Sequence, residues 1–192
     1  MSTILLTGRN GFIGQELIPF LKRNHKMVSV IRSQKDRIDY RSEELIVNDI
    51  CNIKLTEVKK YKVDLIIHLA AQVRGRPSDK LKNNIESTQR ISSIASSLDV
   101  PIIFLSSTNV FFDAVLGNYT KSKIICEEIL KNNNPMCCII RVPLVVGLKS
   151  SSMETIRGFY KRYSFFPLFG KQDGKTQPIH VSSLIDLIVK LV

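Results

Sequence analysis

Short apolar runs alternate with amphipathic segments along most of the chain. The runs have the length of buried strands and lie at 4–6, 27–32, 44–48, 63–68, 101–105 and 137–142. The segments at 12–21, 79–98 and 121–130 repeat apolar residues at helical spacing. Strands that alternate with helices pair in parallel through right-handed crossovers. The pattern therefore predicts an α/β protein with a doubly wound parallel sheet.

The alternation weakens after about residue 147. A helix is expected at 153–163, an aromatic loop at 165–170, and a short strand at 177–181 that leads into a final helix. In doubly wound sheets, ligands bind beyond the carboxyl ends of the strands. We expect the tail to form a partial cap over that edge.

A glycine-rich turn joins the first predicted strand to the first predicted helix, from Thr7 to Gly14. Gly8 allows a sharp turn, Gly11 leaves room for a pyrophosphate at the helix start, and Gly14 allows close packing of helix on strand. The first N–H groups and the positive end of the helix dipole then face an anion. This motif predicts a dinucleotide-binding site.

Tyr119 and Lys123 stand four residues apart at the start of a predicted helix, on one face of it. An ammonium beside a phenol favours the phenolate and lowers the tyrosine pKa from its reference value of about 10. A tyrosine tuned in this way exchanges a proton with a carbonyl or hydroxyl. The same spacing also occurs by chance on helix surfaces. Its position after the glycine turn and a serine-rich strand end favours a catalytic pair.

Other polar residues end strands at the same edge of the sheet. Ser106 and Ser107 end the fifth predicted strand, where a hydroxyl can hold a substrate oxygen, and turn capping is the alternative. His68 ends the fourth strand and is expected to be packed and hydrogen-bonded, without a catalytic role. The small Ala70 and Ala71 fit the close approach of a cofactor.

Charged residues after the second and third predicted strands bear on the cofactor. Arg32 suits the 2′-phosphate of NADP, whereas an acidic residue there suits NAD. Arg9 adds charge at the same place, and Asp49 can accept a hydrogen bond from an adenine amino group. The alternatives are two solvent-facing arginines and an ordinary turn aspartate. We favour NADP over NAD.

Composition narrows the function classes. The 192 residues, 44% of them hydrophobic, suit one domain with a buried core. The Lys and Arg residues behind the net charge of +11 are scattered along the chain, so a solvated surface is the first interpretation. Attraction of phosphate-bearing small molecules is the second interpretation, and nucleic-acid binding is the last. The four cysteines lack metal-ligand spacing, so we expect reduced thiols in a cytoplasmic protein and no metal site. No apolar run has the length of a membrane span.

Together these segments resemble the extended short-chain dehydrogenase/reductase family, the NAD(P)-dependent epimerases and dehydratases of nucleotide sugars. The matching motifs follow one another along nearly the whole chain: Thr7-Gly8-x-x-Gly11-Phe12-Ile13-Gly14, His68-Leu69-Ala70-Ala71, Asn84-Ile85-Glu86-Ser87-Thr88, Ser106-Ser107, Tyr119-x-x-x-Lys123, Arg141-Val142-Pro143, Val146-Gly147 and Pro178-Ile179-His180-Val181. The resemblance implies a Rossmann fold, with a dinucleotide-binding domain at 1–147 and a partial substrate-binding region at 148–192 packed on it.

The resemblance also implies site roles. Tyr119 is the acid/base, Lys123 lowers its pKa and holds the cofactor ribose, Ser107 polarises the substrate oxygen, and Asn84 holds the site geometry or a proton-relay water. The helices that carry Asn84 and Tyr119 form the dimer face of such proteins, so a homodimer is expected. The residues implied to bind NADP or NAD are Gly8, Arg9, Asn10, Gly11, Phe12, Ile13, Gly14, Arg32, Asp49, Ile50, Leu69, Ala70, Ala71, Tyr119, Lys123 and Pro143.

The expected activity is 4-keto reduction or epimerisation of a nucleotide-linked sugar, in surface polysaccharide synthesis. Val110-Phe111-Phe112-Asp113 stands where this family has Val-Tyr-Gly, the loop from Ser107 to Tyr119 is short, and the chain ends at Val192, earlier than its relatives. These departures leave open a second hypothesis. In it, the protein is a cofactor-binding scaffold or regulator without a working substrate pocket.

Overall fold

The computed structural model describes residues 1–32, 43–47, 49–73, 76–112, 117–164 and 177–192. The chain divides into two compact units, Met1–Arg141 and Val142–Val192. We describe each unit by itself.

A parallel sheet organises the first unit. The described residues form a sheet of six strands in the order β3-β2-β1-β4-β5-β6. The strands are β1 (Thr3–Thr7), β2 (Lys26–Ile31), β3 (Glu43–Ile46), β4 (Leu65–His68), β5 (Ile102–Ser107) and β6 (Cys137–Val142). β1 pairs in parallel with both β2 and β4, and parallel pairs β2–β3 and β4–β5 extend the sheet on either side. This arrangement confirms the doubly wound α/β fold.

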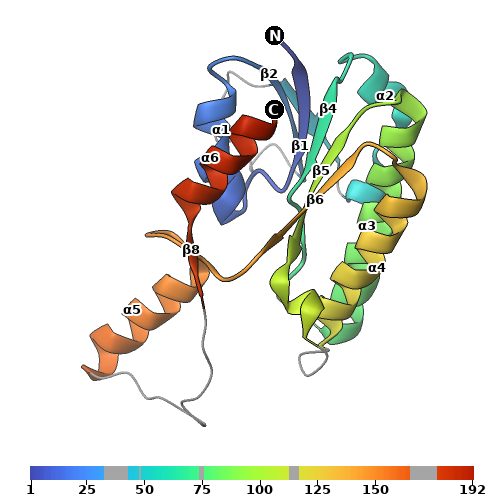
Figure 1. The fold of residues 1–192 in the computed structure, drawn as a ribbon. Helices are drawn as coiled ribbons and strands as arrows, with labels where there is room; N and C mark the ends of the chain where they lie inside the picture. The colour runs from blue at the N-terminus through green and yellow to red at the C-terminus, as the bar shows by residue number, and fades with distance from the viewer. Residues whose placement is uncertain (33–42, 48, 74–75, 113–116, 165–176) are drawn as a thin grey trace. The chain divides into compact units, whose positions relative to one another are not determined.

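Three long helices cover the sheet. Figure 1 shows α3 (Pro77–Leu98) and α4 (Asn118–Asn133) side by side on one face, and α1 (Phe12–Leu21) on the other. Three shorter elements join the strands: η2 (Ile50–Asn52), α2 (Leu55–Lys59) and η3 (Thr108–Phe111). The hydrophobic pattern did not predict these short elements, because none is long enough to show a helical repeat.

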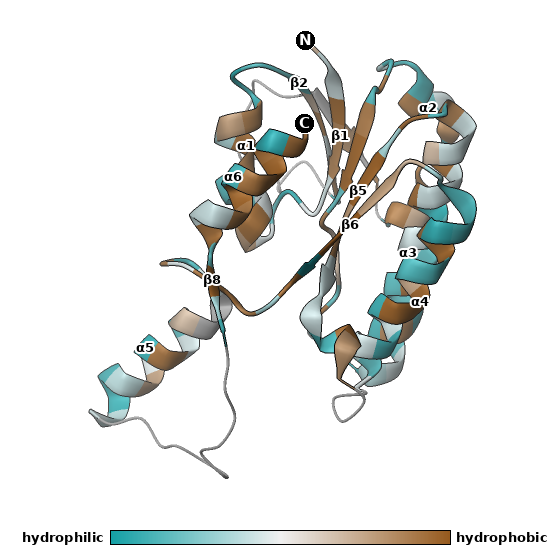
Figure 2. Cartoon of the chain, in the orientation of Figure 1, coloured by the Kyte–Doolittle hydropathy of each residue, from teal (hydrophilic) through white to brown (hydrophobic). Residues whose placement is uncertain are grey.

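The core lies where the strands meet α3 and α4. The central strands are apolar along their length and the helices only along one side (Figure 2). This is the pattern of a sheet covered on both faces. Fully buried residues of the sheet and the two helices form one cluster that includes Leu5, Val28, Ile66, Ile102, Phe104, Ile91, Ile94 and Leu130. The core therefore fixes the strand ends and the helix starts at which the candidate site is built.

The second unit contains a two-stranded parallel pair and two helices. β7 (Val145–Val146) pairs with β8 (Ile179–His180), and α6 (Val181–Leu191) follows β8 directly. α5 (Ser151–Tyr163) begins where Ser150 Oγ accepts a hydrogen bond from the Met153 N–H at 3.3 Å. Both expected helices are thus present, whereas the aromatic loop expected at 165–170 lies outside the described residues. Within the described ranges, no helix combines the length and apolarity that a membrane span requires.

Candidate active site

The glycine turn between β1 and α1 depends on two positions where a side chain does not fit. Gly8 has a φ of +76°, and a Cβ there would lie 2.5 Å from the backbone nitrogen of Ala70, just after β4. A Cβ on Gly14 would lie 2.4 Å from the Gly8 carbonyl oxygen. Gly11 is the N-cap of α1 and has no side chain to cap the first turn. The N–H groups of that turn are therefore available to an anion, and the turn fits a dinucleotide phosphate.

His68 joins three elements beneath this turn. Its side chain is fully buried, its Nδ1 lies 2.6 Å from Thr7 Oγ1, and its Nε2 lies 3.2 Å from Thr88 Oγ1 on α3. Burial, aided by the positive charge of Lys123, lowers the pKa of His68 to about 3. A neutral, doubly hydrogen-bonded imidazole is the packed residue that the sequence indicated.

Three side chains lie four residues apart on α4, and two of them contact β5. Lys123 Nζ donates a hydrogen bond to the Leu105 carbonyl at 2.6 Å and lies 4.3 Å from the centre of the Phe104 ring. One turn earlier is Tyr119, whose ring centre is 5.8 Å from the same ammonium. One turn later, Glu127 Oε1 accepts a hydrogen bond from Ser106 Oγ at 2.6 Å. The expected Tyr119–Lys123 pair therefore sits at the carboxyl end of β5, the edge that also carries the glycine turn.

The pKa of Tyr119 moves in the direction opposite to the one expected. Burial raises the pKa of the Tyr119 phenol above its ordinary value. The Lys123 ammonium donates a hydrogen bond to the Leu105 carbonyl and forms no hydrogen bond to the Tyr119 phenol among the contacts of the described residues. Burial also lowers the pKa of Lys123, to about 8, against the opposing charges of Cys126 and Glu127. The prediction that Lys123 lowers the Tyr119 pKa is therefore wrong for this structure, and the phenol holds its proton at neutral pH.

The two serines at the end of β5 have different surroundings. Ser106 is buried and bonded to Glu127, whereas Ser107 is half-buried and begins η3. Ser107 Oγ accepts a hydrogen bond from the Asn109 N–H at 3.2 Å, which is the capping role. A hydroxyl can accept and donate at once, so this bond leaves the Ser107 hydrogen to donate to a substrate oxygen. Capping and catalysis are compatible at this position.

Asn84 ties α3 to the segment after β4 and to α4. Its Oδ1 accepts a hydrogen bond from the Gln72 N–H at 2.7 Å. Its Nδ2 lies 3.3 Å from the Gln72 carbonyl and 3.2 Å from Ser122 Oγ, which in turn donates to the Tyr119 carbonyl. The buried amide therefore connects to the backbone of Tyr119, consistent with a role in site geometry.

The remaining predicted cofactor residues of the first unit follow its strands β1, β2 and β3, and one residue lies in the second unit. Arg32 follows β2 and is exposed, whereas Arg9 is buried with 1% of its surface accessible, so the solvent-facing alternative fails for Arg9. Asp49 Oδ1 accepts a hydrogen bond from the Cys51 N–H at 3.0 Å and so caps η2, which begins at Ile50. This is the role of the ordinary turn aspartate that the sequence left as the alternative. Pro143 follows β6 in the second unit.

Sequence reasoning missed Glu127, and it gave no role to Arg141, which it noted only as part of the Arg141-Val142-Pro143 motif. Arg141 Nη2 and Nε donate to Glu127 Oε2 and Oε1 at 2.6 and 3.0 Å. Burial alone raises the pKa of this carboxyl, but hydrogen bonds from Arg141 and Ser106 outweigh burial and hold the pKa below its ordinary value. The available signal was the spacing, because Glu127 continues the row of Tyr119 and Lys123 by another four residues.

Comparison with known proteins assigns the family. The family model described as "NAD dependent epimerase/dehydratase family" matches residues 4–153. The chain belongs to the NAD-dependent epimerase/dehydratase family. This assignment confirms the resemblance drawn from the motifs.

Two curated relatives are similar along most of this chain. The decarboxylating sterol-4-alpha-carboxylate 3-dehydrogenase of Dictyostelium discoideum is 25% identical over 202 residues, which cover 88% of this chain and 61% of the relative. Methionine adenosyltransferase 2 subunit beta of Xenopus laevis is 24% identical over 206 residues, which cover 97% and 61%. The chain thus spans about three fifths of the length of these relatives.

Solved structures show the same fold. The NAD-dependent NDP-hexosamine 5,6-dehydratase TunA, described as involved in tunicamycin biosynthesis, has a TM-score of 0.82 and 18% identity, covering 100% of this chain and 72% of that one. The Bordetella bronchiseptica enzyme WbmG, solved in complex with NAD and UDP, has a TM-score of 0.79 and 17% identity, covering 96% and 66%. The Rossmann fold of this family of NAD-dependent enzymes is therefore established for the chain.

Proposed function

We propose that this protein is an NADP- or NAD-dependent oxidoreductase acting on the keto group of a nucleotide-linked sugar, in surface polysaccharide synthesis. The observation that carries the proposal is the placement of Tyr119, Lys123 and Ser107 at the end of β5. The glycine turn ends β1 at the same edge of the parallel sheet. A nicotinamide dinucleotide bound there supplies the hydride.

The chain's own residues supply proton transfer and orientation. The buried phenol of Tyr119 has a raised pKa, so it acts as a general acid toward a carbonyl oxygen. The Ser107 hydroxyl donates a hydrogen bond to the same oxygen, and Lys123 holds the ribose of the cofactor.

Turnover with a defined substrate class tests the proposal. The assay follows NADPH oxidation with UDP- and dTDP-linked 4-keto-6-deoxyhexoses. Tyr119→Phe is expected to lower kcat by about 10²–10⁴-fold and to leave the Kd of NADPH unchanged. Tyr61→Phe is the matched control, because Tyr61 lies between α2 and the start of β4, away from the carboxyl edge. Equal kcat in the two variants would refute the role of Tyr119.

The choice between the two cofactors depends on Arg32. The exposed guanidinium at the end of β2 supports a preference for NADP through its 2′-phosphate. Titration of the wild-type protein and Arg32→Asp with NADP and NAD is expected to show the preference reversed in the variant. Equal affinity of the wild type for both dinucleotides would remove Arg32 from the cofactor site.

A scaffold function is the second candidate. It is favoured by the relative whose name describes it as a subunit, Methionine adenosyltransferase 2 subunit beta. A scaffold would bind NADPH with the glycine turn and give no turnover with the whole substrate panel. An enzyme would show turnover that depends on Tyr119.

We also propose a homodimer formed through α3 and α4. The isoleucines at 124, 125 and 129 on α4 are only partly buried in the single chain. Sedimentation velocity is expected to give twice the mass of one chain, and Ile125→Glu to give monomers. A monomeric wild type at micromolar concentration would refute this arrangement.

A further inference from the structure

Four side chains form a chain of contacts that starts before Ser107 and ends after it. Ser106 on β5 donates to Glu127 Oε1 on α4 at 2.6 Å. Arg141 on β6 donates to both oxygens of Glu127, and its Cζ lies 4.6 Å from the centre of the Phe111 ring at the end of η3. We call Ser106, Glu127, Arg141 and Phe111 the Glu127 network. It begins one residue before Ser107 and returns four residues after it.

The network has the properties of a rigid support. The Glu127 side chain is 4% exposed and both of its oxygens are bonded. The Arg141 guanidinium is used twice, because its edge meets the carboxylate and its face covers an aromatic ring. Lys131 reaches the same carboxylate only from the surface, at 3.5 Å and with 53% of its side chain exposed. Arg141 is therefore the partner that fixes the position of the carboxylate.

Ser107 lies between the two ends of the network along the chain. Successive side chains of a strand point to opposite faces, so fixing Ser106 toward α4 turns Ser107 to the other face. The η3 turn that Ser107 caps ends at Phe111, which is 63% exposed and contacts the face of Arg141.

We propose that Glu127 and Arg141 are positioning residues that hold the Ser107 hydroxyl in place for its substrate, by fixing Ser106 before it and Phe111 after it. This inference rests on the proposed function only for the role of Ser107. The network itself is a property of the fold. It assigns a function to the acidic residue that follows the Tyr119–Lys123 pair on α4.

The experiment combines kinetics with amide exchange in matched variants. Arg141→Met alone leaves the Glu127 carboxylate buried without its partner and risks unfolding. The principal variant is therefore the double substitution Glu127→Gln and Arg141→Met, which removes both charges. Phe111→Leu tests the far end of the network alone. Lys131→Met and Phe112→Leu are the controls, because Lys131 is mainly exposed and Phe112 is the exposed neighbour of Phe111.

The double variant is expected to reduce UDP-4-keto-6-deoxyglucose with a kcat about 10–100-fold below wild type, with an NADPH Kd within about 2-fold. The kcat of Phe111→Leu is expected to lie between those of the double variant and the wild type, and the kcat of each control is expected to match the wild type. Exchange at the Asn109 and Phe112 amides, bonded to Ser107 Oγ and to the Asn109 carbonyl, should be faster in the double variant than in Lys131→Met. An unchanged kcat, or a kcat that falls only as NADPH affinity falls, would overturn the proposal.

The two proposals fail in different ways. If the wild-type protein binds NADPH but reduces no keto sugar in the panel, the proposed function fails. Amide exchange then decides the network by itself: faster exchange in the double variant supports it, and unchanged exchange refutes it. If the wild type is active and exchange is unchanged in the double variant, the network is refuted whatever the kcat.

Discussion

Thr7 Oγ1 lies 2.6 Å from Nδ1 of His68, at the point where β1 and β4 end side by side. The same oxygen accepts a hydrogen bond from the Ala70 N–H at 3.3 Å. The other ring nitrogen, Nε2, lies 3.2 Å from Thr88 Oγ1 on α3, so both nitrogens of the neutral imidazole have a hydroxyl partner. One neutral ring thus ties the glycine turn to α3.

Stability should therefore fall on acidification through His68. In the unfolded chain the imidazole binds a proton below its ordinary pKa of 6.5, whereas in the folded protein it does so only near pH 3. Between these values the unfolded state binds more protons, so the free energy of unfolding falls by up to about 1.4 kcal/mol per pH unit as the pH is lowered. Urea unfolding of the wild type and His68→Gln between pH 7 and pH 5 measures this. Parallel pH profiles for the two proteins would contradict the assignment.

The glycine turn makes a prediction of its own. Ala at position 8 would combine a left-handed backbone with a contact of 2.5 Å to Ala70, and Ala at 14 would meet the Gly8 carbonyl. We expect each substitution to lower the free energy of unfolding by about 2–4 kcal/mol and to weaken NADPH binding. Gly158→Ala, on α5 with open space around it, should instead stabilise by about 0.5–1 kcal/mol. Urea unfolding of the three variants tests the contrast, and equal effects at positions 8 and 158 would refute it.

The hydrophobic pattern predicted the strands and helices whose burial requires apolar residues at a regular spacing. A strand buried on both faces is an uninterrupted apolar run, so β4 was visible, and α3 was visible because its apolar residues repeat at helical spacing. The positions of Gly8 and Gly14 were also readable, because only glycine tolerates such a turn.

The buried charges of α4 could not be read in the same way. Lys123 and Glu127 are 4% and 3% exposed, yet in sequence they resemble the solvated face of an ordinary helix. Their partners, the Leu105 carbonyl and Arg141, lie on strands that only the fold brings near. Burial explains the error about Tyr119, because spacing on a helix does not show how far a phenol is removed from water.

Asn84 provides a third prediction, with a control in the adjacent residue. Asn84→Leu removes one acceptor for the Gln72 N–H and two donor contacts in a buried place. We expect a loss of about 1–3 kcal/mol in the free energy of unfolding, because polar groups are left unsatisfied. Asn83→Ala loses only an exposed bond to Gln72 Oε1 and should change it by less than about 0.5 kcal/mol. Chemical denaturation that ranks the two variants equally would refute the role of Asn84.

The buried ammonium of Lys123 is expected to lower the free energy of unfolding at neutral pH. Burial lowers its pKa from 10.5 to about 8, so below pH 8 the folded state holds a charge that the unfolded chain carries more favourably. Between pH 8 and 10.5 the folded state loses this proton and the unfolded state keeps it, so the stability of the wild type rises with pH across that window.

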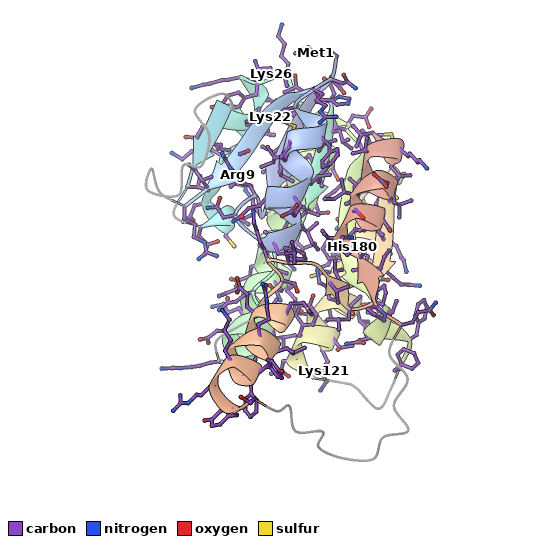
Figure 3. All side chains as sticks on the ribbon, turned by 90° about the vertical axis from the view of Figure 1, so that its left-hand side faces the viewer. Met1, Arg9, Lys22, Lys26, Lys121 and His180 are labelled. Carbon is purple, nitrogen blue, oxygen red and sulfur yellow. The ribbon has the colours of Figure 1, made fainter. Side chains whose placement is uncertain are left out.

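Lys123→Met removes this dependence. The stability of the variant relative to wild type should therefore be highest at neutral pH and decline by about 1–3 kcal/mol as the pH approaches 10.5. Loss of the hydrogen bond to Leu105 adds a cost to the variant at every pH. Lys121→Met is the control, because Lys121 lies two residues earlier on α4 and is exposed. Figure 3 shows Lys121 at the opposite end of the first unit from Lys22 and Lys26. A difference between Lys123→Met and wild type that stays constant with pH would show that the buried ammonium is not destabilising.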